Sequence, residues 1–221
     1  MFEGIGPKAA RLVTELAVRQ DKAWYAEHKP EIDALVYAPL RALLEAAKPR
    51  IERLYPRQTV SVKVFRIHRD VRFSKDKSPF KDHASGVILV GPDQEPGSGA
   101  GALYLQIGPE EGAAAGRWAM EGETLARYRR AVLQKGGEIS KLLRPLLAKG
   151  YVVISAQQLA RAPKGVDPAH PHANLLRHKG LALDFPPIPA KVRHSPKLLD
   201  WCVDRAAEVA PVIRWVLRHT G

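Results

Sequence analysis

The feature that most constrains the fold is a change in hydrophobic period along the chain. Apolar residues recur at helical spacing up to about residue 56, alternate with polar residues from Thr59, and return to helical spacing after Trp118. No repeat and no low-complexity linker separates the three blocks. We therefore expect a single α+β domain over residues 1–221, with a central sheet and helices contributed by both ends of the chain.

The first block predicts three helices. Gly6-Pro7 places a proline in a first helical turn, and Asp21 is a good N-cap for a second helix. Pro30 is expected to interrupt that second helix. A third helix follows over residues 32–51, and the two prolines inside it are expected to kink or divide it.

The middle block predicts strands over residues 60–73, 86–90 and 103–107. The apolar parity reverses near Val64 and Phe65, which predicts a bulge there or a strand that is covered on both faces. The connections between the strands are short and contain no helix, and one of them is the glycine-rich segment 91–101. We therefore expect a largely antiparallel sheet, with N-terminal and C-terminal helices covering one face.

The last block predicts helices between about Glu123 and Gly150, a strand over residues 151–155 and a strand over residues 181–185. Residues 160–197 are otherwise expected to be irregular. A long final helix is predicted, with Ser195 as its N-cap and Pro196 in its first turn.

Charge is the second strong feature of the sequence. The 35 Lys and Arg against 23 Asp and Glu give a formal net charge of +12, and 45% of the residues are hydrophobic, as in a globular protein. Residues 57–83 carry eight cations and three anions, and residues 161–197 carry seven and two. The sequence does not determine whether these two basic segments meet in space.

Composition and targeting signals limit where the protein works. No stretch approaches 18 apolar residues, so no membrane span is expected. The N-terminus shows no basic region followed by an apolar run, and the one cysteine, Cys202, excludes an internal disulfide. These observations favour a cytoplasmic protein, and they leave its oligomeric state open.

Residues 65–81 are the densest group of candidate functional residues, with six cations and two aspartates. Arg69 shares the parity of the apolar residues around it, so we expect its guanidinium to enter the interior and to meet an acid or a bound anion. His68 and Asp70 are the nearby candidates for a catalytic acid or base. The predicted ligand-binding residues are Arg66, Arg69, Arg72, Lys75, Lys77, Lys81 and Trp118.

The same run also carries a family resemblance. Residues 69–81, Arg-Asp-Val-Arg-Phe-Ser-Lys-Asp-Lys-Ser-Pro-Phe-Lys, resemble the signature of the domain of unknown function 2461, a family of bacteria and fungi. Further likenesses are Trp24-Tyr25, the strand 103–107, Gly116-Arg117-Trp118, and the late Pro-Lys-Gly, His-Pro and Leu-Leu-Arg elements. His28 departs from the usual Asn, and Ala113–Ala115 stand where glycines are common. The resemblance implies membership of the family and no particular activity.

The other sequence motifs give weaker evidence of a functional site. His170 and His172 have few evident co-ligands, so neither a bound metal nor a cofactor is predicted. Three functions fit the basic residues. One is binding of a small phosphate- or carboxylate-bearing ligand, the second is a structural ion-pair network with function in partner contacts, and the third is nucleic-acid binding through a basic surface.

Overall fold

The computed structural model describes residues 2–72 and 74–221, and it has an antiparallel sheet with helices packed on one face. The strand order is β1-β2-β3-β4-β6-β5, and every neighbouring pair is antiparallel. The strands are β1 (Val60–Val64), β2 (Ala84–Val90), β3 (Ala100–Ile107), β4 (Gly112–Arg117), β5 (Val152–Ile154) and β6 (Leu181–Asp184). The expected α+β architecture with its antiparallel sheet is confirmed.

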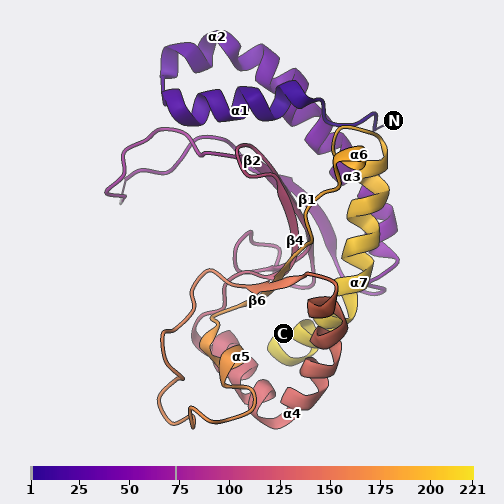
Figure 1. The fold of residues 1–221 in the computed structure, drawn as a ribbon. Coiled ribbons are helices and arrows are strands. Elements are labelled where there is room, and N and C mark those ends of the chain that lie inside the picture. The colour runs from indigo at the N-terminus through magenta and orange to yellow at the C-terminus, as the bar shows by residue number, and fades with distance from the viewer. Residues whose placement is uncertain (1, 73) are drawn as a thin grey trace.

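The helices come from both ends of the chain, as predicted. They are α1 (Pro7–Arg19), α2 (Lys22–Ile32), the π-helical turn η1 (Asp33–Tyr37), α3 (Ala38–Glu52), α4 (Gly122–Ala148), α5 (Ala173–Arg177), α6 (Ala190–Arg193) and α7 (Lys197–Thr220). Helix α3 packs on β1 and β2, and α7 packs on β3 and β4. Figure 1 shows these two helices against the convex side of a strongly curved sheet, while the concave side is open.

Several local expectations are wrong. Pro30 lies inside α2, and the chain stays helical through η1 into α3. In η1 the N–H of Ala38 bonds to the carbonyl of Asp33, five residues back. This wider turn stands just before Pro39, which has no N–H to give. The expected helix break is therefore replaced by one π-helical turn.

The helices predicted between residues 123 and 150 are present as two helical segments of α4, which meet at a kink at Lys135. One helix start differs from the sequence pattern. Ser195 does not cap the final helix, because its hydroxyl donates to the carbonyl of Val192, and α7 begins after Pro196. The short helices α5 and α6 were not predicted.

The largest difference concerns residues 65–73. Strand β1 ends at Val64, and within residues 65–72 the only β-bridge is the isolated one between His68 and Phe80. Ile67 is buried, whereas Phe65 and Val71 are only half-buried. Phe73 lies outside the described residues. The alternation seen in the sequence therefore reflects local packing and does not extend the strand.

One strand was missed altogether. Residues 112–117 read Gly-Ala-Ala-Ala-Gly-Arg, a composition with low strand propensity. They form β4 because β3 and β6 pair with them on both sides. No helix within the described residues is long and apolar enough to cross a membrane.

Candidate functional site

The residues singled out by the sequence lie in a long loop, residues 65–83, which we call the basic loop. Its base is held to the sheet and to itself by backbone bonds, from Phe65 N to the carbonyl of Ser85 (2.9 Å) and from Lys81 N to the carbonyl of Ile67 (2.8 Å). The ring of Tyr25 on α2 contacts the rings of His68 and Phe80, at centroid distances of 5.1 and 4.8 Å. The loop is thereby fixed against α2 and extends beside the open side of the sheet (Figure 1).

Three of the six cations of this loop have partners inside it. Arg69 is paired with Asp76. Arg72 bonds both carboxylate oxygens of Asp70, at 3.0 and 2.7 Å. Lys77 donates to the carbonyl of Val71. The structural interpretation of the run therefore applies to half of its cations.

The acids of these pairs are held in their ionised form. Asp76 accepts hydrogen bonds from the hydroxyl and the backbone N–H of Ser78, and these bonds together with Arg69 hold the pKa of its carboxyl well below the usual range. The pKa of Asp70 is likewise lowered, chiefly by its hydrogen bonds with Arg72. A carboxylate with a lowered pKa and a bound guanidinium is a poor general base, so the geometry offers little support for the prediction that Asp70 is catalytic. His68 packs its ring against Tyr25 and Phe80.

The other three cations of the loop, Arg66, Lys75 and Lys81, form no ion pair or side-chain hydrogen bond with any described residue. Lys81 places its Nζ 5.2 Å from the centre of the Phe65 ring. Burial lowers the pKa of the Lys81 ammonium, and the nearby charge of Arg66 lowers it further. Two like charges thus stand together without an ion pair within 4 Å, and the acid that Arg66 influences, Asp70, is already paired with Arg72.

The expectation of a buried Arg69 is wrong. Its side chain is 30% exposed, and its partner Asp76 is 56% exposed. The arginine that is buried is Arg117 at the end of β4, which was not predicted. Its guanidinium bonds Asp93 (2.9 Å), the carbonyl of Ser98 (2.5 Å) and the hydroxyl of Thr220 (3.1 Å). Arg117 therefore ties the glycine-rich loop and the end of α7 to the sheet.

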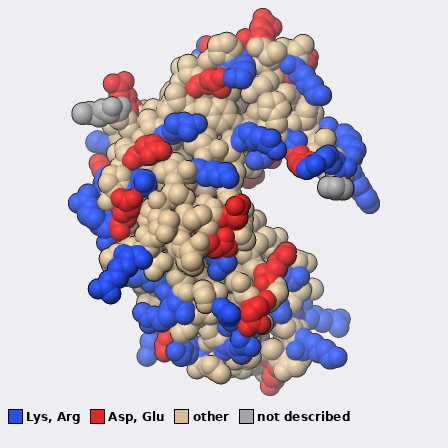
Figure 2. All heavy atoms as spheres, turned by 180° about the vertical axis from the view of Figure 1, so that it is seen from behind, with Lys and Arg blue, Asp and Glu red and all other residues tan. Residues whose placement is uncertain are grey.

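Beside the basic loop lies the concave face of the sheet, which we call the hollow. Figure 2 shows it as a deep notch in the molecular surface. In Figure 1 the basic loop and the segment 155–180 stand on its two sides, so the two basic stretches of the sequence face each other across it. The strand registers place one row of residues across all six strands on this face: Lys63, Val87, Tyr104, Ala114, Asp184 and Val152.

Small residues form the floor of the hollow. On β4 the concave-facing positions are Gly112, Ala114 and Gly116, while Ala113 and Ala115 belong to the core under the helices. The neighbouring concave-facing position on β6 is Ala182. These small side chains leave space between the larger ones on β3 and β6. The alternation of small residues at 112–116 is the sequence signal that would have indicated this floor.

Two polar side chains flank the floor. The hydroxyl of Tyr104 donates to Gln106 (3.0 Å), whose amide donates to the carbonyl of Glu110 (2.9 Å), and burial raises the pKa of the Tyr104 phenol. Asp184 stands on the other side of Ala114 and has no cationic partner among residues 2–72 and 74–221. Although Asp184 is an exposed residue, partial burial of its carboxyl raises the pKa of that group. The hollow therefore offers a phenol and an unpaired carboxylate.

Trp118 lies at the opposite end of the sheet from the basic loop. Arg117, at the end of β4, pairs with Ala100 on β3, and Ala100 aligns through β2 with Val60 at the start of β1. The basic loop, in contrast, follows the other end of β1. Trp118 continues the parity of Gly116, and 46% of its surface is exposed. The structure thus brings Trp118 to an end of the hollow and not to the predicted cations.

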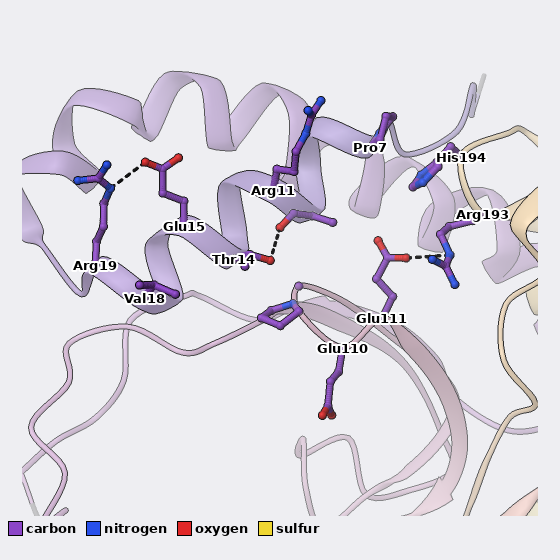
Figure 3. A pocket seen from close by; sticks show the side chains of 13 residues that line it. Pro7, Arg11, Thr14, Glu15, Val18, Arg19, Glu110, Glu111, Arg193 and His194 are labelled. Atoms are coloured by element: carbon purple, nitrogen blue, oxygen red, sulfur yellow. Dashed lines mark hydrogen bonds and ion pairs between the residues drawn. The ribbon is translucent and has the colours of Figure 1, made fainter.

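A second, separate pocket lies between α1, the turn 108–111 and α6, with a volume of about 1240 Å³ (Figure 3). Ion pairs within it join Glu15 to Arg19 (2.8 Å) and Glu111 to Arg193 (3.1 Å). The side chain of Arg11 points away from it. Its charges are largely balanced internally, and none of the predicted site residues lines it.

His178 forms a hydrogen-bonded chain with Ser155 and Gln158. The amide nitrogen of Gln158 lies 3.2 Å from Nε2, so Nδ1 carries the hydrogen and donates to Ser155 Oγ at 3.0 Å. The Ser155 hydroxyl donates to the carbonyl of Gln157 (2.9 Å). Because that hydrogen is directed to a carbonyl, the serine is not activated by the histidine. The chain is complete only with a neutral imidazole.

This arrangement predicts a loss of stability in acid. Burial, together with Arg177, lowers the pKa of His178 in the folded state below its unfolded value of about 6.5. The unfolded state therefore binds more protons, and the free energy of unfolding should fall as the pH drops through about 6.5. Urea unfolding at pH 7.5 and at pH 5 measures this. The variant His178→Gln should show a smaller decline, and an equal decline in both proteins would contradict the prediction.

Metal-ligating side chains do not gather in the part of the chain that the structure describes, where no three or more of His, Cys, Asp and Glu form a group. The Nδ1 of His170 accepts from the backbone N–H of His172, whose own ring packs over Gly136 on α4. Cys202 is buried, and desolvation raises the pKa of its thiol to about 12.

Comparison with known proteins gives one match. The sequence model of a family described as a conserved hypothetical protein, DUF2461, matches residues 8–215. No curated protein and no solved structure matches the chain. Since the match spans nearly the whole chain, including the basic loop and every strand of the hollow, this protein belongs to the DUF2461 family.

Proposed function

We propose that the protein binds a small molecule through an anionic group, a phosphate or a carboxylate, held by Arg66 and Lys81 at the rim of the hollow with Lys75 nearby in the same loop. The observation that carries the proposal is the adjacency of Arg66 and Lys81, neither of which forms an ion pair with a described residue. Arginine and lysine are suited to this task, because a guanidinium binds such groups bidentately and an ammonium adds a compact charge.

Electrostatics supports this assignment. Phe65 follows β1 opposite Ser85, and the Lys81 ammonium lies over its ring. Desolvating a cation next to another cation is unfavourable in the free protein, and a bound anion would relieve both effects. The remaining cations, Arg69, Arg72 and Lys77, already have partners in the loop. We therefore assign the predicted ion-pair network to these three and ligand binding to the unpaired three.

Nucleic-acid binding is favoured by the net charge of +12 and by the two basic segments that face each other across the hollow. In the described part of the basic loop, His68 and Phe80 pack against each other and against Tyr25, and Phe65 lies next to the Lys81 ammonium, so these rings form no row of free stacking surfaces. A small anionic ligand is therefore the better-supported proposal.

The test is the double variant Arg66→Gln/Lys81→Gln. Inorganic phosphate should raise the thermal midpoint of the wild-type protein by a few degrees, because a ligand that binds only the folded state stabilises it. The double variant should show no rise. Without phosphate it should be at least as stable as wild type, because it lacks two adjacent like charges.

The matched control is Lys141→Gln/Arg144→Gln on α4. It removes the same charge from exposed positions that form no ion pair with any described residue. Its response to phosphate should equal that of wild type. A phosphate-induced rise that survives in Arg66→Gln/Lys81→Gln would contradict the proposal.

A further inference from the structure

We infer that the ligand is a nucleotide whose base carries an amino group, with its phosphate at Arg66 and Lys81 and its base above Ala114, where the amino group donates to Asp184. The inference rests on the proposed anion site and adds the identity of the rest of the ligand. It is carried by the shape and the polar groups of the hollow.

The shape comes from the cross-strand row. Tyr104, Ala114 and Asp184 are direct neighbours on β3, β4 and β6. Tyr104 and Asp184 are therefore two strand spacings apart, about 10 Å, with only a methyl group between them. Gly112, half-buried like Ala114, continues the low floor toward one end of β4, whereas Gly116 toward the other end is buried against β6. This space suits a flat ring that lies on β4.

The carboxylate of Asp184 determines which groups a ligand must present at one side of the hollow. It has no cationic partner within the described ranges, and the hollow partly desolvates it. A carboxylate only accepts hydrogen bonds, so its ligand must supply N–H or O–H groups. Pairing of an acidic side chain with the amino group of cytosine is an established form of base recognition.

Aromatic groups stand where a base would need them. The Tyr104 ring forms one wall, and its hydroxyl is held by Gln106. Trp118 follows the floor strand at the end of the hollow and is 46% exposed. A half-buried tyrosine ring and an exposed tryptophan ring beside a small-residue floor are suited to stacking against a planar base.

The length of the hollow excludes a very short ligand. From β1, beside the cations, to β6, which carries Asp184, there are four strand spacings, about 19 Å along a flat sheet. Curvature and the long lysine side chain shorten this span. A nucleotide has a suitable size, because its phosphate lies at one end, the sugar in the middle, and the hydrogen-bond donor of the base at the far end.

Three probes test the inference by isothermal titration calorimetry: CMP, UMP and ribose 5-phosphate. CMP and UMP differ in that cytosine carries an amino group where uracil carries a carbonyl. CMP should bind about tenfold more tightly than UMP, the effect of one hydrogen bond to a charged group. In Asp184→Asn the preference should disappear or reverse, because the Asn amide can donate to the uracil carbonyl.

A steric variant gives an independent readout. Ala114→Leu fills the floor from the open side of the sheet, so it should remove the advantage of CMP over ribose 5-phosphate while leaving ribose 5-phosphate binding unchanged. Ala26→Leu, on the exposed surface of α2, is the matched control and should bind all three probes as wild type does.

The outcomes separate the two proposals. Equal binding of CMP, UMP and ribose 5-phosphate, lost in Arg66→Gln/Lys81→Gln, would overturn the base site and leave the anion site in place. Binding of none of the three would overturn both. A preference for CMP that persists in Asp184→Asn would overturn the role of Asp184.

Discussion

Replacing Arg117 by Met should lower the free energy of unfolding by about 3–5 kcal/mol, the effect of breaking a buried ion pair from one side. The Arg117 side chain is 9% exposed, and its guanidinium bonds Asp93, the carbonyl of Ser98 and the hydroxyl of Thr220. Methionine would fill much of the volume but leave the Asp93 carboxylate and the Ser98 carbonyl without their donors. Equilibrium urea unfolding measures the loss.

Two comparisons make this result specific. Arg69→Met is the matched control, because it removes an ion pair whose acid is 56% exposed, and its effect should be small. The double variant Arg117→Met/Asp93→Asn should be more stable than Arg117→Met alone, since it no longer contains an unpaired carboxylate. If Arg69→Met proved as destabilising as Arg117→Met, the distinction between the two arginines would be wrong.

The second large effect is expected from Gly116→Ala. Gly116 has a φ of +139°, and a Cβ at this position would overlap the Cα of Ala182 and the carbonyl oxygen of Leu181 on β6. Both partners are backbone and cannot rotate away. Backbone strain and overpacking together should destabilise the protein by about 3 kcal/mol or more. Thermal unfolding followed by circular dichroism should show a much lower midpoint.

Gly112→Ala is the control for this prediction. It makes the same change on the same face of β4, where a Cβ would have no neighbour within 4 Å. Its midpoint should stay close to that of wild type. Similar midpoints for the two variants would show that the close approach of β4 and β6 does not limit stability.

Much of the architecture was predictable because it depends on local patterns. The period-two run at β1, the apolar segments at β2 and β3 and the short connections between them led to an antiparallel sheet, and the long apolar stripe of α7 indicated a covering helix. Asp21 caps α2 through its side chain, as expected. In each case the deciding interactions lie between residues close in sequence.

The candidate site was predictable only in part. Six cations in 17 residues marked the basic loop, but the sequence could not show which of them have partners. The parity argument selected Arg69 for burial because it assumed a continuous strand, and β1 ends at Val64. The arginine that is buried, Arg117, follows a Gly-Ala run that carries no strand signal.

The sequence by itself therefore determined the succession of a helical, a strand and a second helical block, the antiparallel pairing of β1, β2 and β3, and the position of the basic run, because these depend on period, turn length and composition. Only the tertiary structure decided that residues 112–117 form a strand, that small residues on it open a hollow between Tyr104 and Asp184, and that Arg66 and Lys81 lie together without an ion-pair partner among the described residues. These features arise from pairing between segments separated by tens of residues, and local propensity carries no information about such pairing.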